Sequence, residues 1–427
     1  MSHEGSPASI RHTAATHTKL AFVMVGLPAR GKTFIARKVA RYLSWLGHRT
    51  QVFNVGAYRR AHLGSRQPHS FFDSRNEEGN RARLEMAERA LSDMLAWLGQ
   101  GGEVAIYDAT NSTRERRAFI ADACAKTGIE VVFIESICDN PDLIAANIRA
   151  TKAHSPDYAQ VEAEEAVADF EQRIAHYAEV YEEVDRQDGR YIKIIDVGET
   201  VVAHRIDGYL PSRLVFYLLS FHLVPRPIWL TRHGESQFNV EGRIGGDSSL
   251  TSAGLTYAQA LAKFVREQAS SPVVWTSTLQ RTIETAKTVN LPYDPWKALD
   301  EIDAGICDGL TYAEIASQMP QEYAARRGQK FRYRYPRGES YADVIDRLEP
   351  VIFEIERERR PLLIVAHQAV LRALYAYLMD QKPEACPTLP IPLHTVIELT
   401  PTAYGCEERR FALLGPDDST NATESSA

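Results

Sequence analysis

Residues Gly26 to Thr33 read Gly-Leu-Pro-Ala-Arg-Gly-Lys-Thr and match the phosphate-binding pattern G-x-x-x-x-G-K-S/T. The glycines Gly26 and Gly31 let backbone N–H groups turn towards phosphate oxygens, and the start of the following helix adds positive potential. We expect Lys32 to reach the β- and γ-phosphates of a nucleotide and the Thr33 hydroxyl to bind Mg²⁺. A chain of this length matches the pattern by chance roughly 1–2% of the time, so we predict a nucleotide-phosphate site.

An acidic residue, Asp108, directly follows the apolar stretch Val104 to Tyr107. If that stretch is a strand of an open parallel sheet, its carboxyl end faces the ligand crevice. An aspartate there can hold Mg²⁺, directly or through water, or orient an attacking hydroxyl. The sequence Asp-Ala-Thr-Asn-Ser-Thr also suits a helix N-cap or an Asx turn. The two interpretations are compatible, and we favour the functional one.

Two groups of arginines also follow predicted strands, in Tyr58 to Arg60 and in Arg114 to Arg117. Arginine at the crevice suits bidentate capture of a sugar phosphate. The ordinary alternative is a solvent-exposed helix face, and this is what we expect for Arg117. A phosphate-binding role is favoured, mainly on the family resemblance described below, for Arg59, Arg60 and Arg116.

In the second half, the stretch Leu230 to Glu235 reads Leu-Thr-Arg-His-Gly-Glu and follows a predicted strand. A histidine at the carboxyl end of a strand can attack a phosphoryl group in line, which splits one hard step into two. The neighbouring Arg232 would neutralise developing charge, and the glycine after His233 would leave space for the phosphate.

Other residues of the second half extend this site. His367 follows the apolar stretch Leu362 to Ala366, so two histidines at the ends of two core strands could share one phosphate. Glu301 could protonate the leaving oxygen. Singly, His367 could be a hydrogen-bonded core histidine and Glu301 a surface carboxylate, but the whole set in chain order argues against coincidence. Further phosphate donors are expected at Asn239, Arg243 and Arg281.

Apolar and helical patterns alternate along both halves, which predicts an α/β protein with mainly parallel sheets and helices on both faces. Expected strands of the first half are Leu20 to Val25, Gln51 to Val55, Val104 to Tyr107, Val131 to Ile137 and Tyr191 to Val197. Expected helices there are Thr33 to Leu46 and Arg81 to Leu98. In the second half we expect strands at Ile228 to Leu230, Val273 to Trp275 and Leu362 to Ala366, and helices at Gly254 to Glu267 and Leu279 to Val289.

Length and composition fit a two-domain globular protein of 427 residues with a net charge of -7. The acidic balance disfavours a general nucleic-acid binder. No run of roughly 18 apolar residues predicts a membrane span. The spacing of the five cysteines indicates reduced thiols and a cytoplasmic protein; they are Cys124, Cys138, Cys307, Cys386 and Cys406. We expect disordered tails at residues 1–18 and 415–427 and a domain boundary at Pro225 to Pro227.

From about Lys19 to Glu408 the chain resembles the 6-phosphofructo-2-kinase/fructose-2,6-bisphosphatase family. In the first half the resemblance is carried by Gly26 to Thr33, Asn54 to Arg60, Asp108 to Asn111, Arg114 to Arg117 and Ser155 to Tyr158. In the second half it is carried by Arg232 to Ser236, Gly242 to Asp247, Trp296 to Gly305, Tyr333 to Tyr341 and Ala366 to Val370. The segment Phe71 to Asn76 follows the family only loosely.

The resemblance implies a P-loop kinase domain at residues 19–225 and a phosphoglycerate-mutase-like histidine phosphatase domain at residues 226–414. The first would transfer the γ-phosphate of MgATP to the 2-hydroxyl of fructose 6-phosphate. The second would remove that phosphate, so the chain would set the level of a glycolytic regulator. Small molecules would be the partners, without nucleic acid or membrane, and we allow for a homodimer. The short termini leave little room for the regulatory tails of some members.

The resemblance also implies roles for individual residues. Kinase chemistry and metal binding would use Lys32, Thr33, Asp108 and Lys152, with Cys138 and Asn147 near the nucleotide. Fructose 6-phosphate would contact Arg59 or Arg60, Arg83, Thr110, Arg116, Arg173 and Tyr177. In the phosphatase, His233 would accept the phosphoryl group, Glu301 would donate a proton, and His367 would stabilise the transition state with Arg232 and Arg281. Substrate would be held by Asn239, Gly245, Tyr312, Arg326, Lys330, Tyr341, Gln368 and Arg372.

Three other functions are considered. One half of the chain could be catalytically silent, although both sets of reactive groups look complete. A metabolite-sensing module with two silent sites would predict the loss of Lys32 or His233, and neither is lost. A nucleic-acid end-processing enzyme could combine the same domains. Such an enzyme would need a basic, aromatic-lined groove, which the net negative charge of the chain disfavours.

Overall fold

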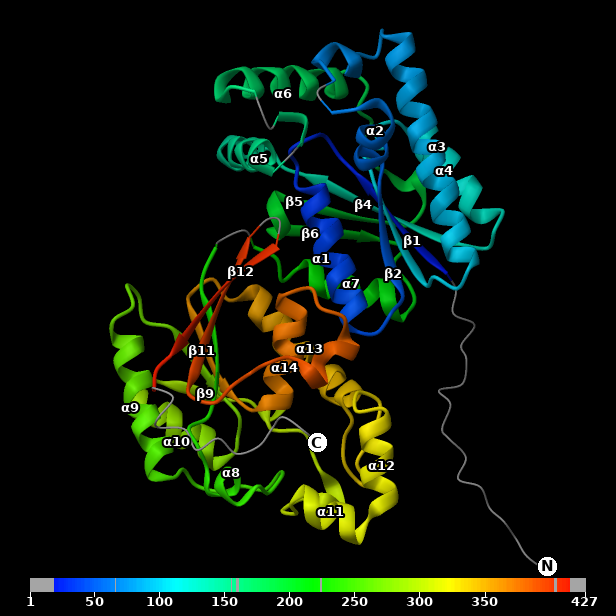
Figure 1. Ribbon diagram of the computed structural model, residues 1–427. Coiled ribbons are helices and arrows are strands. Elements are labelled where there is room, and N and C mark those ends of the chain that lie inside the picture. The colour runs from blue at the N-terminus through cyan, green and yellow to red at the C-terminus, as the bar shows by residue number, and fades with distance from the viewer. Residues whose placement is uncertain are drawn as a thin grey trace, which may run out of the picture. The chain divides into compact units, whose positions relative to one another are not determined.

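The computed structural model describes residues 19–65, 67–154, 156–158, 161–222, 225–402 and 405–414. The chain divides into two compact units. The first holds the residues up to Ala40 together with His48–Asp196 and Val201–Pro211, and the second holds Arg41–Gly47, Val197–Thr200 and the residues from Ser212 onward. The two tails expected from the sequence lie outside the described residues. Each unit is built on one sheet with helices around it (Figure 1).

The sheet of the first unit has the strand order β2-β3-β1-β4-β5-β6. Its strands are β1 (Leu20–Val25), β2 (Thr50–Asn54), β3 (Val104–Asp108), β4 (Glu130–Ile137), β5 (Tyr191–Ile195) and β6 (Thr200–His204). From β2 to β5 the neighbouring strands pair in parallel. The helices of this half of the chain are α1 (Lys32–Trp45), α2 (Val55–Leu63), α3 (Glu77–Gly99), α4 (Arg114–Ala125), α5 (Pro141–His154), α6 (Ala163–Ala178) and α7 (Tyr209–Leu218), with short 3₁₀ turns η1 (His69–Phe72), η2 (Pro156–Tyr158), η3 (Arg186–Asp188) and η4 (Asp196–Gly198). The end of α1 from Arg41 and most of α7, from Ser212, belong to the second unit.

The central strand β1 confirms the buried strand predicted from its apolar sequence, since all six of its residues are buried. Alternate residues Ala21, Val23 and Val25 belong to a core cluster that includes residues of α3 and α4. The residues between them are buried on the other face of the sheet, so helices cover both faces. A strand buried in this way exposes only its ends, and the ends are where ligand-binding groups can stand.

Helix α3 begins four residues before the predicted start at Arg81. The side chain of Asn76 accepts a hydrogen bond from the Gly79 backbone N–H at 2.8 Å, which caps the first turn. The two acidic residues of that turn favour the positive end of the helix dipole. The helix therefore begins at its polar cap, before the apolar residues from which its start was predicted.

The sheet of the second unit has the order β12-β11-β7-β10-β8-β9. Its strands are β7 (Ile228–Arg232), β8 (Val273–Thr276), β9 (Tyr293–Pro295), β10 (Leu362–Ala366), β11 (Thr395–Thr402) and β12 (Gly405–Ala412). The helices are α8 (Gln237–Glu241), α9 (Ser252–Arg266), α10 (Gln280–Val289), α11 (Tyr312–Gln318), α12 (Pro320–Gly328), α13 (Tyr341–Arg357) and α14 (Gln368–Leu378), with 3₁₀ turns η5 (Lys297–Leu299), η6 (Gly305–Cys307) and η7 (Pro383–Thr388).

Four strands of this second sheet, β7 to β10, pair in parallel, and the antiparallel hairpin β11–β12 extends one edge. The hairpin has few buried residues in β12, so its sequence lacks the apolar run that marks the other strands. Within the described residues, no helix is long and apolar enough to cross a membrane.

The prediction that Arg117 lies on a solvent-exposed helix face is wrong. Its side chain, in α4, is completely buried. Its guanidinium pairs with Asp188 at 2.6 Å and donates to the backbone carbonyl oxygens of Glu182 and Glu183 at 2.8 and 3.2 Å. Arg117 therefore fastens α4 to the loop before β5. Sequence spacing could not show this, because the partners lie more than sixty residues away.

We expect Arg117→Ala to lower the free energy of unfolding by about 3–5 kcal/mol, because it leaves the Asp188 carboxylate buried without its counterion. The neighbouring variant Arg114→Ala is the control. Its ion pair with Asp185 is largely exposed, so its loss should cost at most about 1 kcal/mol. Urea unfolding followed by circular dichroism measures both. Equal losses for the two variants would contradict a structural role for Arg117.

Candidate active sites

The loop Gly26 to Thr33 connects β1 to α1, as the sequence predicts. Gly26 has a φ of +138°, and a Cβ there would lie 2.5 Å from the Ser136 carbonyl oxygen. Gly31 also has a positive φ, of +80°. At Gly26 only glycine allows both the positive φ and the close approach of β4. The backbone turn and the packing of β4 therefore both require glycine at this position.

Lys32 is buried at the start of α1, and its Nζ donates to the Leu27 carbonyl oxygen at 2.6 Å. Burial lowers the pKa of Lys32 to about 8, although the nearby Asp108 opposes that shift. The ammonium group curls back over its own loop, the position in which it can meet phosphate oxygens bound by the loop. The role predicted for Lys32, contact with the nucleotide phosphates, stays a prediction.

Asp108 lies at the end of β3 and is 2% exposed. Its Oδ2 accepts a hydrogen bond from the Thr33 hydroxyl at 2.8 Å and another from Asn54 Nδ2. Burial raises the pKa of Asp108, and the hydrogen bond from Thr33 opposes this. A carboxylate beside a hydroxyl is an oxygen donor set that fits Mg²⁺.

Asn54 is a site residue that the sequence did not reveal. Because β2 and β3 pair in parallel with Asn54 opposite Asp108, the two side chains meet at the same sheet edge. The only signal in the sequence is a polar residue near the end of a predicted strand. Such a residue is also an ordinary helix cap, and Asn54 does cap α2.

The residues expected near the nucleotide have local partners. Asn147 Nδ2 donates to the carbonyl oxygen of Ala29 in the phosphate loop at 3.0 Å. Cys138 is buried just after β4, and the charge of Arg30 acts on its thiol. Thr110 accepts the Gly26 N–H with its carbonyl oxygen at 3.0 Å. The side chain of Lys152 lies outside the described residues.

Three of the predicted arginines converge on one carboxylate. Arg59 pairs closely with Asp157, and guanidinium nitrogens of Arg60 and Arg173 lie 3.7 and 3.8 Å from the same Oδ2. Arg59 is 4% exposed, yet among the described residues its Nε and Nη1 have no hydrogen-bond partner, and neither has Nε of Arg173. Buried donors without partners are costly, so this cluster has spare capacity for an anionic ligand.

Aromatic rings form a wall beside this arginine cluster. The guanidinium of Arg173 lies 3.7 Å from the ring centre of Phe72, and that of Arg59 lies 5.3 Å from it. Arg83 lies 5.9 Å from Phe72 and 5.5 Å from Tyr177. The structure thus places Arg83 and Tyr177 beside the cluster, while their contact with a sugar phosphate stays a prediction. Arg116 instead donates to the Tyr107 hydroxyl at 3.2 Å.

In the second unit, the parallel register of β7 and β10 sets Arg232 opposite Ala366. The residue that follows the end of each strand is a histidine. The His233 N–H donates to the Ala366 carbonyl oxygen at 3.1 Å. The rings of His233 and His367 have centroids 5.1 Å apart. The pairing of two core strands therefore brings together the two histidines that the sequence singled out.

The guanidinium of Arg281 lies between the two rings. Its Nε is 3.1 Å from His233 Nε2 and 3.2 Å from His367 Nδ1. Because a guanidinium only donates, both ring nitrogens must be acceptors. The proton of His233 is then on Nδ1, which donates to the Gly234 carbonyl oxygen at 2.7 Å, and the proton of His367 is on Nε2, which donates to Ser277 Oγ at 2.7 Å.

Both imidazoles are held neutral. Burial, followed by the charges of Arg281 and Arg232, lowers the pKa of His233 well below 6.5. Burial and the charge of Arg281 lower the pKa of His367 in the same direction. A neutral His233 whose Nε2 lone pair faces a buried guanidinium has the properties of a nucleophile towards an anion bound at that guanidinium.

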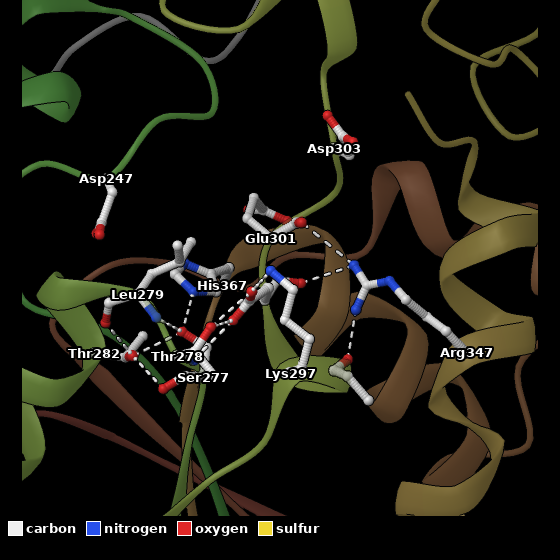
Figure 2. Close-up of polar contacts among 12 residues, drawn as sticks. Asp247, Ser277, Thr278, Leu279, Thr282, Lys297, Glu301, Asp303, Arg347 and His367 are labelled. Atoms are coloured by element: carbon white, nitrogen blue, oxygen red, sulfur yellow. Dashed lines mark hydrogen bonds and ion pairs between the residues drawn. The ribbon is translucent and has the colours of Figure 1, made fainter. Parts of the chain in front are cut away.

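Glu301 is tied to the same sheet edge, since its Oε1 accepts from the Ala369 N–H at 3.2 Å. Arg347 supports this loop by donating to the carbonyl oxygens of Asp300 and Glu301 at 2.8 and 3.3 Å, as Figure 2 shows. Ser277, beside His367 in the same view, and Arg347 are positioning residues that the sequence did not indicate. Neither belongs to a motif, and each acts through a distant partner.

A cavity of about 590 Å³ adjoins these groups. Glu301 and Gly245 line it, and so does Gly246, whose carbonyl oxygen accepts from Arg281 Nη1 at 2.7 Å. Gly245 has a φ of +68°, which favours glycine, and a Cβ there would lie 1.7 Å from Asp308 Oδ1, so a side chain would have to displace that carboxylate. Neither histidine lines the cavity, which therefore lies beside the pair.

The remaining residues predicted for the second site form pairs. Tyr312 accepts a hydrogen bond from Arg326 at 2.6 Å, and Tyr341 accepts one from Arg372 at 3.3 Å. The other predicted residues have the following positions: Arg232 donates to the Ile391 carbonyl oxygen, Asn239 bonds Ser236 within the cap of α8, Arg243 pairs with Glu241 and Glu314, Lys330 follows α12, and Gln368 begins α14.

These pairs are electrically linked to the histidine site. The charge of Glu301 acts on both Arg281 and Tyr341, and burial raises the pKa of Tyr341 to about 12. Buried arginines and tyrosines that influence one another in this way suit an anion with several oxygens. Among the described residues Asn239 bonds Ser236 and not the histidines, and its role stays a prediction.

A phosphate loop in the first unit and a histidine–arginine site in the second define a kinase joined to a histidine phosphatase. The family model for 6-phosphofructo-2-kinase matches residues 8–225, and the model for the histidine phosphatase superfamily (branch 1) matches residues 228–413. The chain belongs to the bifunctional family of 6-phosphofructo-2-kinase/fructose-2,6-bisphosphatase, as the sequence resemblance indicated.

Curated relatives support this assignment. The 6-phosphofructo-2-kinase/fructose-2,6-bisphosphatase of Gallus gallus is 52% identical over 390 residues, covering 90% of this chain and 83% of the relative. The protein of that name in Arabidopsis thaliana is 51% identical over 404 residues, covering 92% of this chain and 54% of the relative. Among solved structures, the α-ribazole phosphatase of Shigella flexneri aligns with 44% of this chain and 96% of its own at 25% identity with a TM-score of 0.41, so the assignment rests on sequence.

We expect the ring signals of His233 and His367 to show no protonation as the pH falls through 6.5, because burial and Arg281 keep both rings neutral. Nuclear magnetic resonance of protein labelled in its histidine rings, without substrate, measures this. Spectra of His233→Ala and His367→Ala assign the two signals. A midpoint at the ordinary value of 6.5 for either ring would contradict the neutral pair.

Proposed function

We propose that the first unit transfers the γ-phosphoryl group of ATP to the 2-hydroxyl of fructose 6-phosphate and that the second unit hydrolyses the fructose 2,6-bisphosphate formed. The observation that carries this proposal is the buried guanidinium of Arg281 between two neutral histidines, combined on one chain with the phosphate loop. The names of the relatives join the same two activities. The opposed pair would set the level of a glycolytic regulator.

In the kinase, the loop from Gly26 to Thr33 binds the nucleotide phosphates, and Lys32 neutralises the charge that develops on the transferred group. Thr33 and Asp108 would hold Mg²⁺, which would supply positive charge to offset the charge of the phosphate oxygens. Asp108 and Asn54 are fixed at the sheet edge, so they can also orient the attacking hydroxyl. Lys152 is proposed as a further catalytic residue on the family resemblance.

The sugar phosphate is proposed to bind the cluster of Arg59, Arg60 and Arg173 described above. Its oxygens would accept from the buried donors that have no partner within the described part of the chain. Arg83 and Tyr177 would close one side of this site, and Thr110 and Arg116 would contact the sugar. Asn147 and Cys138 would flank the nucleotide.

In the phosphatase, the phosphate on the sugar 2-oxygen is proposed to bind at Arg281, where it displaces the bonds to the ring nitrogens. His233 Nε2 then attacks phosphorus, and the bond to the sugar oxygen breaks as Glu301 gives that oxygen a proton. His367, oriented by Ser277, and Arg232 stabilise the charge of the transferring group. Water hydrolyses the phosphohistidine in the second step.

Further assignments are proposed on the same basis. We assign the kinase domain to residues 19–225 and the phosphatase domain to residues 226–414. A cytoplasmic location is supported by the five cysteines, none of which is in a disulfide. The homodimer stays a prediction that light scattering can test. Substrate contacts in the phosphatase are proposed at Asn239, Gly245, Tyr312, Arg326, Lys330, Tyr341, Gln368 and Arg372.

His233→Ala should raise the net yield of fructose 2,6-bisphosphate from MgATP and fructose 6-phosphate, because the nucleophile of the opposing reaction is gone. Product measured over time in wild type and variant tests this. Glu301→Gln is the companion variant and should slow hydrolysis by about 10²–10⁴-fold while a phosphohistidine can still form. No product from either protein would mean that the first unit is silent or uses another sugar.

The kinase should lose efficiency towards ATP as the pH rises through about 8, because Lys32 then loses the charge that meets the phosphates. Above that pH, kcat/KM for ATP should fall by about tenfold per pH unit. Lys32→Arg keeps its charge throughout, so its profile should stay flat even if the rate is lower. A flat wild-type profile to about pH 9 would contradict the assigned pKa.

A further inference from the structure

One group of three potential metal ligands stands out among the described residues of the first unit. Ligand atoms of Asp73, His176 and Glu179 lie within 4.8 Å of one another. His176 and Glu179 are three residues apart at the end of α6, so they lie on the same side of the helix. Asp73 comes from a different element, directly after η1. The group therefore joins two segments about one hundred residues apart in sequence.

The imidazole of His176 is oriented towards this group. Its Nδ1 is buried and has no hydrogen-bond partner among the residues that the structure describes, although it lies 3.8 Å from Asp73 Oδ2. That distance is too long for a hydrogen bond and leaves the ring nitrogen unsatisfied. A cation bound within this group would satisfy the buried ring nitrogen, which the nearby Asp73 carboxylate does not.

A second histidine supports the ring from behind. His69 Nδ1 lies 3.3 Å from His176 Nε2, and the two rings stack with centroids 5.6 Å apart and planes 10° apart. If His176 donates its Nε2 proton to His69, its Nδ1 lone pair faces Asp73. Histidines that bind metals almost always donate their other ring proton to a neighbouring acceptor. The His69 contact has this geometry.

We propose that Asp73, His176 and Glu179 bind a divalent transition ion of the zinc type and leave a fourth position for water. One imidazole nitrogen and two carboxylate oxygens are suitable zinc ligands, and three protein ligands plus water are common for this ion. Nitrogen coordination favours zinc over Mg²⁺, which prefers oxygen. This site is separate from Thr33 and Asp108, and its existence does not depend on the function proposed above.

Arg75 competes with the ion for Asp73. Its Nε and Nη2 donate to the two carboxylate oxygens at 3.0 and 2.9 Å. This two-point contact holds the carboxylate at the position where the ion would bind, so the ion would have to displace Arg75 from Asp73. Because the Arg75 side chain is 77% exposed, it can swing into solvent when an ion takes its place.

The ion would join the two segments, η1 and α6, that carry the aromatic wall of the proposed sugar-phosphate site. Asp73 follows Phe72, and His176 precedes Tyr177, the two aromatic residues against which Arg83 and Arg173 pack. Fastening η1 to α6 would fix these rings and pre-organise the arginines. Bound zinc should therefore lower the KM for fructose 6-phosphate, and this kinetic consequence alone rests on the proposed function.

Equilibrium dialysis of the full chain against Zn²⁺, with Mg²⁺ in excess, tests the site directly. Wild type should bind an ion that His176→Ala loses, and Glu179→Gln should weaken binding without risk to folding because Glu179 is exposed. His69→Ala should weaken binding by about tenfold, as removal of an outer-shell partner does. Arg75→Ala should tighten binding, because it removes the competing cation.

The exposed His62 supplies the control, since its ring contacts only Tyr58 in the described part of the chain. His62→Ala should bind zinc as the wild type does. Zinc held at the histidine pair of the second unit would survive in His176→Ala and disappear in His233→Ala, so the two sites can be counted separately. Equal zinc binding by wild type, His176→Ala and Glu179→Gln would overturn the proposal, whatever the enzyme does with its substrates.

Discussion

Parallel strands of a sheet all end at one edge, and this constraint places the reactive groups of both units. In the first unit, Asn54 and Asp108 are register partners at the ends of β2 and β3. In the second unit, the register of β7 and β10 sets His233 beside His367. Strands buried on both faces can offer polar groups only at their ends, so a continuous apolar core and a concentrated site arise from the same arrangement.

Burial then sets the chemistry of these groups. Removing a charge from water without a full set of partners is unfavourable, so buried groups change their protonation or await a ligand. His233 stays neutral beside Arg281, and Lys32 has a lowered pKa beside the phosphate loop. Arg59 keeps two unpaired donors although it is 4% exposed. Each site is thus pre-organised for phosphate oxygens, which supply the missing partners.

Supporting residues hold these groups in place, and they differ in kind from the reactive ones. Ser277 fixes the proton of His367 on Nε2, and Arg347 holds the loop that carries Glu301. In the first unit, Asp157 gathers three arginines whose charges would otherwise repel one another. These residues do no chemistry themselves, but without them the reactive side chains would have many rotamers and less defined geometry.

The sequence by itself determined the two α/β units, the phosphate loop, the two histidines and the family, because apolar periodicity and short motifs are local properties of the chain. It also indicated the arginines that meet at Asp157. Only the tertiary structure decided that Arg281 lies between the histidines, that Arg117 is buried in the core, and that Asp73 meets His176 and Glu179. These contacts join residues from 48 to about a hundred positions apart, and their distances depend on strand register and helix packing, which no local pattern encodes.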